Sequence, residues 1–88
     1  MQDTPADHRA TVFLVDDDEA VRSSLTLLIR SAGHRIECFA SAGAFLRQFD
    51  PDAPGCLVLD VRMPGMSGMQ LLQELRLRGA SLPVLLIT

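Results

Sequence analysis

The stretch VLDVRMPGMSG, residues 58–68, places a single carboxylate, Asp60, at the end of an apolar run and follows it with a proline and two glycines. The residues CLVLD (56–60) form a short continuous apolar run, which is typical of a strand buried on both faces of a sheet. Ser67 and Gln70 have the spacing of a helix capping box, so a helix is predicted to follow the loop. The stretch therefore predicts a strand, a tight turn and a helix, with an acid at the strand end.

Apolar runs and helical patterns alternate along the rest of the chain. TVFLV (11–15) predicts a second buried strand, RIECF (35–39) alternates in polarity like a strand at a sheet edge, and PVLLIT (83–88) predicts a fourth strand. Helical spacing predicts three helices. The first begins at Asp18 and Glu19, ends at Gly33 and carries apolar residues on one face: Val21, Leu25, Leu28, Ile29 and Ala32. The second is capped by Ser41 and carries Phe45 and Phe49, and the third turns Leu72 and Leu75 inward and ends at Gly79.

This alternation of strands and helices predicts an α/β fold with a parallel sheet between helices. The edge-like strand 35–39 and the core-like strand 11–15 indicate the strand order 2-1-3-4. Right-handed crossovers would place the first helix on one face of the sheet and the other two on the opposite face. The winding direction reverses between the first and third strands, so a ligand crevice is expected beyond their carboxyl ends.

Composition limits the class of protein. A chain of 88 residues with 48% hydrophobic residues allows one domain with a thin core. The net charge of -3 argues against a surface for nucleic acid or anionic membranes. Residues 1–10 lack the apolar segment of a signal peptide and are interpreted as a flexible leader of a cytoplasmic protein. Cys38 and Cys56 lack metal-site spacing and are interpreted as small apolar residues.

Acidic residues end two strands that are predicted to be neighbours. Asp16, Asp17, Asp18 and Glu19 follow the first strand, and Asp60 ends the third. Like charges in a partly desolvated site raise one another's pKa, and a hard divalent cation such as Mg²⁺ relieves this. Helix capping accounts for Asp18 and Glu19 but not for Asp60. The sequence therefore predicts a cation site at this mouth.

Thr88 ends the predicted fourth strand and would lie at the same mouth. Its hydroxyl can donate a hydrogen bond to an anion held there. A β-branched residue at a strand end is the equally weighted alternative.

Three segments together resemble the receiver domain of two-component response regulators: LVDDDEAVRSSL (14–25), CLVLDVRMPGMSGMQLLQEL (56–75) and LPVLLIT (82–88). The resemblance covers residues 11–88 and is strongest to the FixJ-type receivers, which precede a helix-turn-helix DNA-binding domain. It implies a flavodoxin-like (CheY-like) doubly wound sheet. It also implies transcription control through an output domain outside this chain, with no nucleic acid or membrane contacted by this segment.

The resemblance implies a role for each matching residue. Asp60 would accept a phosphoryl group from a sensor histidine kinase or a histidine phosphotransfer protein, without being a turnover enzyme. Asp16, Asp17, Asp60 and the backbone carbonyl of Arg62 would hold Mg²⁺, and Thr88 would contact the phosphoryl group and carry the switch.

The sequence departs from the family pattern at its carboxyl end. Receivers have a fifth strand ending in a lysine and two further helices, and this sequence contains neither these elements nor any lysine. Residues 11–88 are therefore expected to form an incomplete receiver after the leader 1–10, with the fourth strand as an open edge.

Two other functions compete with the phosphoacceptor. An interaction module independent of phosphorylation would pair through the open fourth strand with another chain, including a second copy. A phosphatase of the haloacid-dehalogenase type would use Asp16-x-Asp18 and Thr88, but Ala20 stands where that family has threonine or valine, and the loop after Asp60 is left unexplained.

Overall fold

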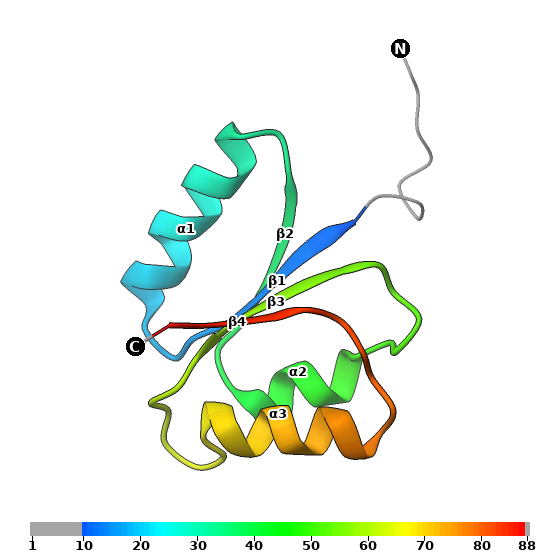
Figure 1. The fold of residues 1–88 in the computed structure, drawn as a ribbon. Coiled ribbons are helices and arrows are strands. Elements are labelled where there is room, and N and C mark those ends of the chain that lie inside the picture. Colours follow the sequence, from blue (N-terminus) through cyan, green and yellow to red (C-terminus); the bar gives the residue numbers. More distant parts are fainter. Residues whose placement is uncertain (1–9, 88) are drawn as a thin grey trace.

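The computed structural model describes residues 10–87, in which strands and helices alternate as the sequence predicts (Figure 1). The elements are β1 (Thr11–Val15), α1 (Glu19–Ser31), β2 (Arg35–Phe39), α2 (Ala42–Gln48), β3 (Gly55–Asp60), α3 (Gly68–Leu77) and β4 (Val84–Ile87). The predicted end of the fourth strand, Thr88, lies outside the described residues. No helix within residues 10–87 is long and apolar enough to cross a membrane.

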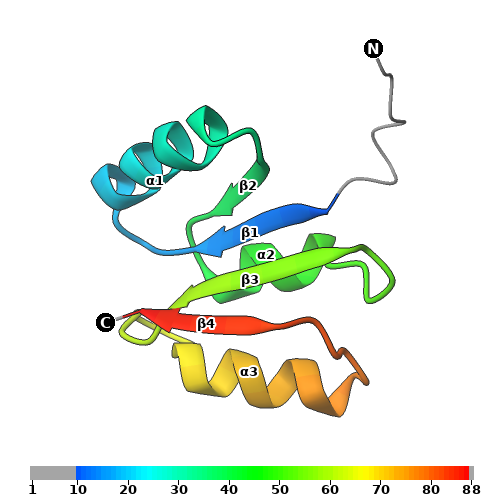
Figure 2. The ribbon, with the colours of Figure 1, turned by 45° about the horizontal axis from the view of Figure 1, so that its top comes forward.

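The four strands form one parallel sheet in the order β2-β1-β3-β4, which confirms the predicted order. Val15, at the end of β1, pairs with Phe39 of β2 and with Leu59 of β3. Helix α1 lies on one face of this sheet, and α2 and α3 lie on the other (Figure 2). The carboxyl ends of β1 and β3 therefore lie side by side at one edge of the sheet.

The core lies between the sheet and the pair α2 and α3. Phe45 of α2 is 1% exposed and contacts three other rings: Phe13 at a centroid distance of 6.0 Å, and Phe39 and Phe49 at 5.3 Å each. Fully buried side chains of β3 and α3 complete this layer: Leu57, Leu59, Leu71 and Leu75. Burial of these apolar surfaces is the main stabilising contribution to the fold.

Side-chain oxygens fix the start of each helix, as the sequence predicts. The Asp18 carboxylate accepts hydrogen bonds from the main-chain N–H groups of Ala20 and Val21, and Ser41 Oγ accepts one from Ala44. Ser67 and Gln70 form a reciprocal capping box, in which each side chain accepts from the other's main-chain N–H. These bonds satisfy donors that a helix otherwise leaves unpaired in its first turn.

In two helices the observed burial differs from the apolar positions that the sequence pattern singles out. Leu28 of α1 and Ala32, which caps the end of this helix, are exposed, Leu28 by 61%, and no residue of α1 is fully buried. The reason is that α1 is the only helix on its face of the sheet within the described residues, so its flank has no neighbour to pack against (Figure 2). In α3, Leu71 is fully buried where the prediction named Leu72, which is half-buried.

Strand β4 is an edge of the sheet, as expected. Leu85 is 61% exposed and Leu86 is 39% exposed, on opposite faces of the strand. Both faces of β4 are thus apolar and partly open in the described structure.

Candidate functional site

Three carboxylates converge where β1 and β3 end. Asp16, Asp17 and Asp60 each place one oxygen within 4.8 Å of the others. Asp16 and Asp17 directly follow β1, and Asp60 is the last residue of β3, so the parallel pairing of these strands brings them together. The predicted convergence of acids from two separated segments is therefore present in the structure.

Asp16 is the most buried of the three acids, with an exposed fraction of 4%. Its main-chain N–H donates to the carbonyl of Phe39 at 3.1 Å, and its Oδ1 accepts from the main-chain N–H of Asp18 at 2.9 Å. Burial raises the pKa of Asp16 above the ordinary carboxyl value, and the negative charge of nearby Asp60 adds to this, while the bond from Asp18 opposes it. The ionised form of Asp16 is therefore disfavoured in the folded protein, and a nearby positive charge would stabilise it.

The loop after Asp60 closes tightly against the end of β3. Asp60 Oδ1 accepts from the main-chain N–H of Arg62 at 3.0 Å, and the Gly68 N–H donates to the Val61 carbonyl at 3.2 Å. Gly65 has a φ of 76°, a conformation that glycine adopts without strain. Gly65 thus supplies the positive φ of the loop, and Gly68 permits the close approach to the end of β3.

The acids border a hollow of about 380 Å³ at this edge of the sheet. Its lining consists of Asp16, Asp17, Asp18, Val21, Asp60 and Ile87. Asp18 is engaged in capping α1, which supports the interpretation of that residue as a cap. Ile87 is the last residue of β4, and its carbonyl oxygen accepts a hydrogen bond from the Val61 N–H at 3.0 Å. The fourth strand therefore reaches the same hollow.

The structure does not test two of the predicted site groups, the Arg62 carbonyl and the Thr88 hydroxyl. Arg62 is exposed, and only its main-chain N–H has a described bond, to Asp60. Its carbonyl therefore stays a predicted ligand. Thr88 lies outside the described residues.

One residue at the site was not singled out from the sequence. Arg22, in the first turns of α1, donates from Nη1 to the carbonyl oxygen of Asp16 at 2.8 Å. The sequence feature that could have indicated this contact is the position of Arg22 in DDDEAVR (16–22), where it follows four acidic residues and lies four residues after the cap Asp18. A helix turn brings such a residue back over the cap.

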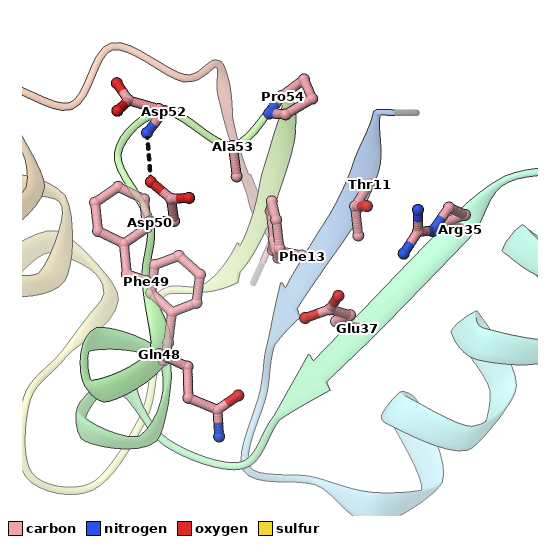
Figure 3. Close-up of a pocket in the computed structure, with 11 residues that line it drawn as sticks. Thr11, Phe13, Arg35, Glu37, Gln48, Phe49, Asp50, Asp52, Ala53 and Pro54 are labelled. Carbon is pink, nitrogen blue, oxygen red and sulfur yellow. Dashed lines mark hydrogen bonds between the residues drawn. The ribbon is translucent and has the colours of Figure 1, made fainter. Parts of the chain in front are cut away.

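A second hollow of about 380 Å³ lies at the opposite, amino-terminal end of the strands (Figure 3). Side chains of β2 border it on one side and the loop 50–54 on the other, with phenylalanines between them. Charged residues of both signs line it: Arg35, Glu37, Asp50 and Asp52. Asp50 Oδ1 accepts a hydrogen bond from the Asp52 N–H at 2.9 Å. The three carboxylates that converge closely enough for a metal ion lie at the other end.

The donor set at the carboxyl end fits a small hard cation. Carboxylate oxygens are the ligands that Mg²⁺ prefers, and one or two protein carboxylates are usual in its sites. A divalent ion would also offset the unfavourable charge on the buried Asp16. The residues present are therefore compatible with Mg²⁺.

Comparison with known proteins identifies the family to which this fold belongs. Residues 12–88 match the model of the response regulator receiver domain. The chain belongs to the response regulator receiver family. The receiver is also 42% identical over 83 residues to the response regulator protein TodT of Pseudomonas putida, and 49% identical over 77 residues to the transcriptional regulatory protein FixJ of Azorhizobium caulinodans.

Solved structures agree with this assignment. The structure of the response regulator StyR matches the receiver with a TM-score of 0.89 and 49% identity, covering 91% of this chain and 40% of StyR. The FixJ-N crystal structure matches with a TM-score of 0.83 and 43% identity over 100% of this chain and 66% of that one. The 2-1-3-4 sheet is thus that of CheY-like receivers, as the sequence predicted.

The receiver spans little more than a third of its curated relatives. The matched region covers 94% of this chain but 37% of TodT, and 88% of this chain but 36% of FixJ. What the whole relatives do beyond this region is therefore a matter of proposal for this chain.

Proposed function

We propose that this receiver accepts a phosphoryl group on Asp60 from the phosphohistidine of a sensor histidine kinase or a histidine phosphotransfer protein. The observation that supports it is that carboxylate oxygens of Asp60, Asp16 and Asp17 lie within 4.8 Å of one another. They lie at the ends of β1 and β3, where the strand order of the sheet reverses. This edge of a doubly wound sheet is where ligands bind. Asp60 is half-buried and faces the hollow, so a phosphoryl donor can reach it.

In the proposed reaction an oxygen of Asp60 forms a bond to phosphorus while the bond from phosphorus to the histidine nitrogen breaks. Asp16, Asp17, Asp60 and the Arg62 carbonyl would hold Mg²⁺, which when bound supplies charge neutralisation for the transferring group. The protein's part is to position Asp60: its Oδ1 is oriented by the Arg62 N–H, and the loop is closed by Gly68. Thr88 is proposed to contact the phosphoryl oxygens.

We further propose that this phosphorylation controls transcription in the cytoplasm through an output domain beyond residues 11–88. The support is that the relative FixJ is a transcriptional regulatory protein, of which the matched region covers only 36%. On this proposal residues 11–88 signal to that domain and residues 1–10 are a leader.

The deciding experiment is labelling with a small acyl phosphate in the presence of Mg²⁺, read by intact-protein mass spectrometry. The parent chain should gain the mass of one phosphoryl group, and Asp60→Asn should gain none. Asp52→Asn removes the same charge at the opposite end of the sheet and should be labelled like the parent. Labelling of Asp60→Asn at the parent's rate would exclude Asp60 as the acceptor.

A further inference from the structure

The β1–α1 turn carries two of the three clustered acids and is bridged by one side chain. The guanidinium of Arg22 donates from Nη1 to the main-chain oxygen of Asp16 at 2.8 Å, in a partly buried contact. Arg22 belongs to α1, and its own N–H bonds to the carbonyl of the cap residue Asp18 at 3.0 Å. The side chain therefore ties the start of α1 to the end of β1 across the acidic turn.

Asp16 is consequently held through three different groups. Its N–H donates to Phe39 of the neighbouring strand, its carbonyl accepts from Arg22, and its Oδ1 accepts from the Asp18 N–H at 2.9 Å. Oδ1 is engaged within the turn, which leaves Oδ2 as the oxygen of Asp16 with no bond described. These bonds fix where the carboxylate lies relative to Asp60.

Such a contact acts on a metal site indirectly. Groups that orient the ligands, without touching the ion, change metal affinity strongly because they determine how much order the ion must impose on binding. A guanidinium hydrogen bond is also stronger than a neutral one, because its donor is charged. The bond that Arg22 donates goes to the main-chain oxygen of Asp16 and not to its carboxylate.

We propose that Arg22 is a positioning residue that orders the acidic turn for divalent-cation binding; the inference rests on the proposed function. Removing its guanidinium should weaken cation affinity without abolishing the chemistry at Asp60. Arg30 of the same helix carries the same charge in the last turn and has no described bond to the acidic turn, so it is the matched control.

The test is a titration of the intact protein with Mn²⁺, with free ion measured by electron paramagnetic resonance. Arg22→Ala should bind about 10-fold more weakly than the parent, Arg22→Lys should recover part of the affinity, and Arg30→Ala should match the parent. In acyl phosphate labelling, the half-saturating Mg²⁺ concentration should rise for Arg22→Ala while the rate at saturating Mg²⁺ stays near that of the parent.

Circular dichroism establishes that each variant is folded. If Arg22→Ala does not fold, Arg22→Gln takes its place in the same titration. Parent-like affinity in the folded neutral variant, or an equal loss in Arg30→Ala, would overturn the role of Arg22 alone. A parent chain that binds no Mn²⁺ would overturn this inference and the proposed cation site together, so the two failures are distinguishable.

Discussion

A Cβ atom at Gly68 would lie 2.4 Å from the main-chain oxygen of Asp60 and 2.9 Å from the Cα of Val61. Both distances are far inside van der Waals contact, and both neighbours are backbone. The first residue of α3 can therefore close on the end of β3 only as glycine, which ties the identity of Gly68 to the position of the proposed phosphoacceptor.

Gly68→Ala should destabilise the protein by about 2 kcal/mol, because the added methyl group must displace the backbone of the Asp60 loop. The free energy of unfolding is measured by urea denaturation followed by circular dichroism. Gly43→Ala is the matched control: its Cβ meets only Arg47 at 3.6 Å within α2, so it should be neutral or stabilising. Equal effects at both positions would contradict the steric account.

Ser67→Ala should cost about 1 kcal/mol of stability, because it removes the oxygen that accepts from the Gln70 N–H at 3.2 Å at the start of α3. Ser67→Asp retains an acceptor and should lose little. The same urea titration compares the two. A loss in the aspartate variant as large as in the alanine variant would show that the cap is not the cause.

Phe45→Ala should cost about 3 to 5 kcal/mol, since this ring is fully buried and contacts three other phenylalanines. That loss is comparable to the whole stability of a marginal domain, so extensive unfolding at room temperature is expected. Far-ultraviolet circular dichroism measures it, and Phe45→Leu should lose less. Leu77→Ala, at a side chain that is 84% exposed, should stay within about 0.5 kcal/mol of the parent.

Asp16→Asn should stabilise the metal-free protein at neutral pH. The pKa of Asp16 in the folded state is raised above its ordinary value of 3.8 by burial and by the charge of Asp60. The folded chain thus holds this proton more tightly than the unfolded chain, and the free energy of unfolding falls as pH rises from about 3.8 through the raised pKa. Asparagine does not ionise, so Asp16→Asn does not lose this part of the free energy of unfolding as pH rises.

The measurement is the difference in melting temperature between Asp16→Asn and the parent as a function of pH in metal-free buffer. The difference should be small below the ordinary carboxyl pKa and should grow toward neutral pH. Saturating Mg²⁺ should then stabilise the parent and reduce the advantage of the variant. A difference that does not depend on pH would rule out titration of Asp16 as its origin.

The sequence by itself determined the local structure and the strand order. Caps at Asp18, Ser41 and Ser67 act through hydrogen bonds within three residues, so they can be read from residue type and spacing. Continuous apolar runs distinguish the central strands from the alternating edge strand β2, and this fixed the sheet as 2-1-3-4. With the sheet ordered, the meeting of Asp16 and Asp60 follows from chain direction alone.

Only the tertiary structure decided which side chains of the helices are buried and which group holds the acidic turn. Periodicity places Leu28 with the inward face of α1, but burial depends on a packing partner, and none lies beside that flank in residues 10–87. The bond from Arg22 to Asp16 likewise depends on the angle at which α1 leaves the sheet, which no spacing rule specifies. Local patterns fix what a residue can do, whereas long-range packing selects its actual partner.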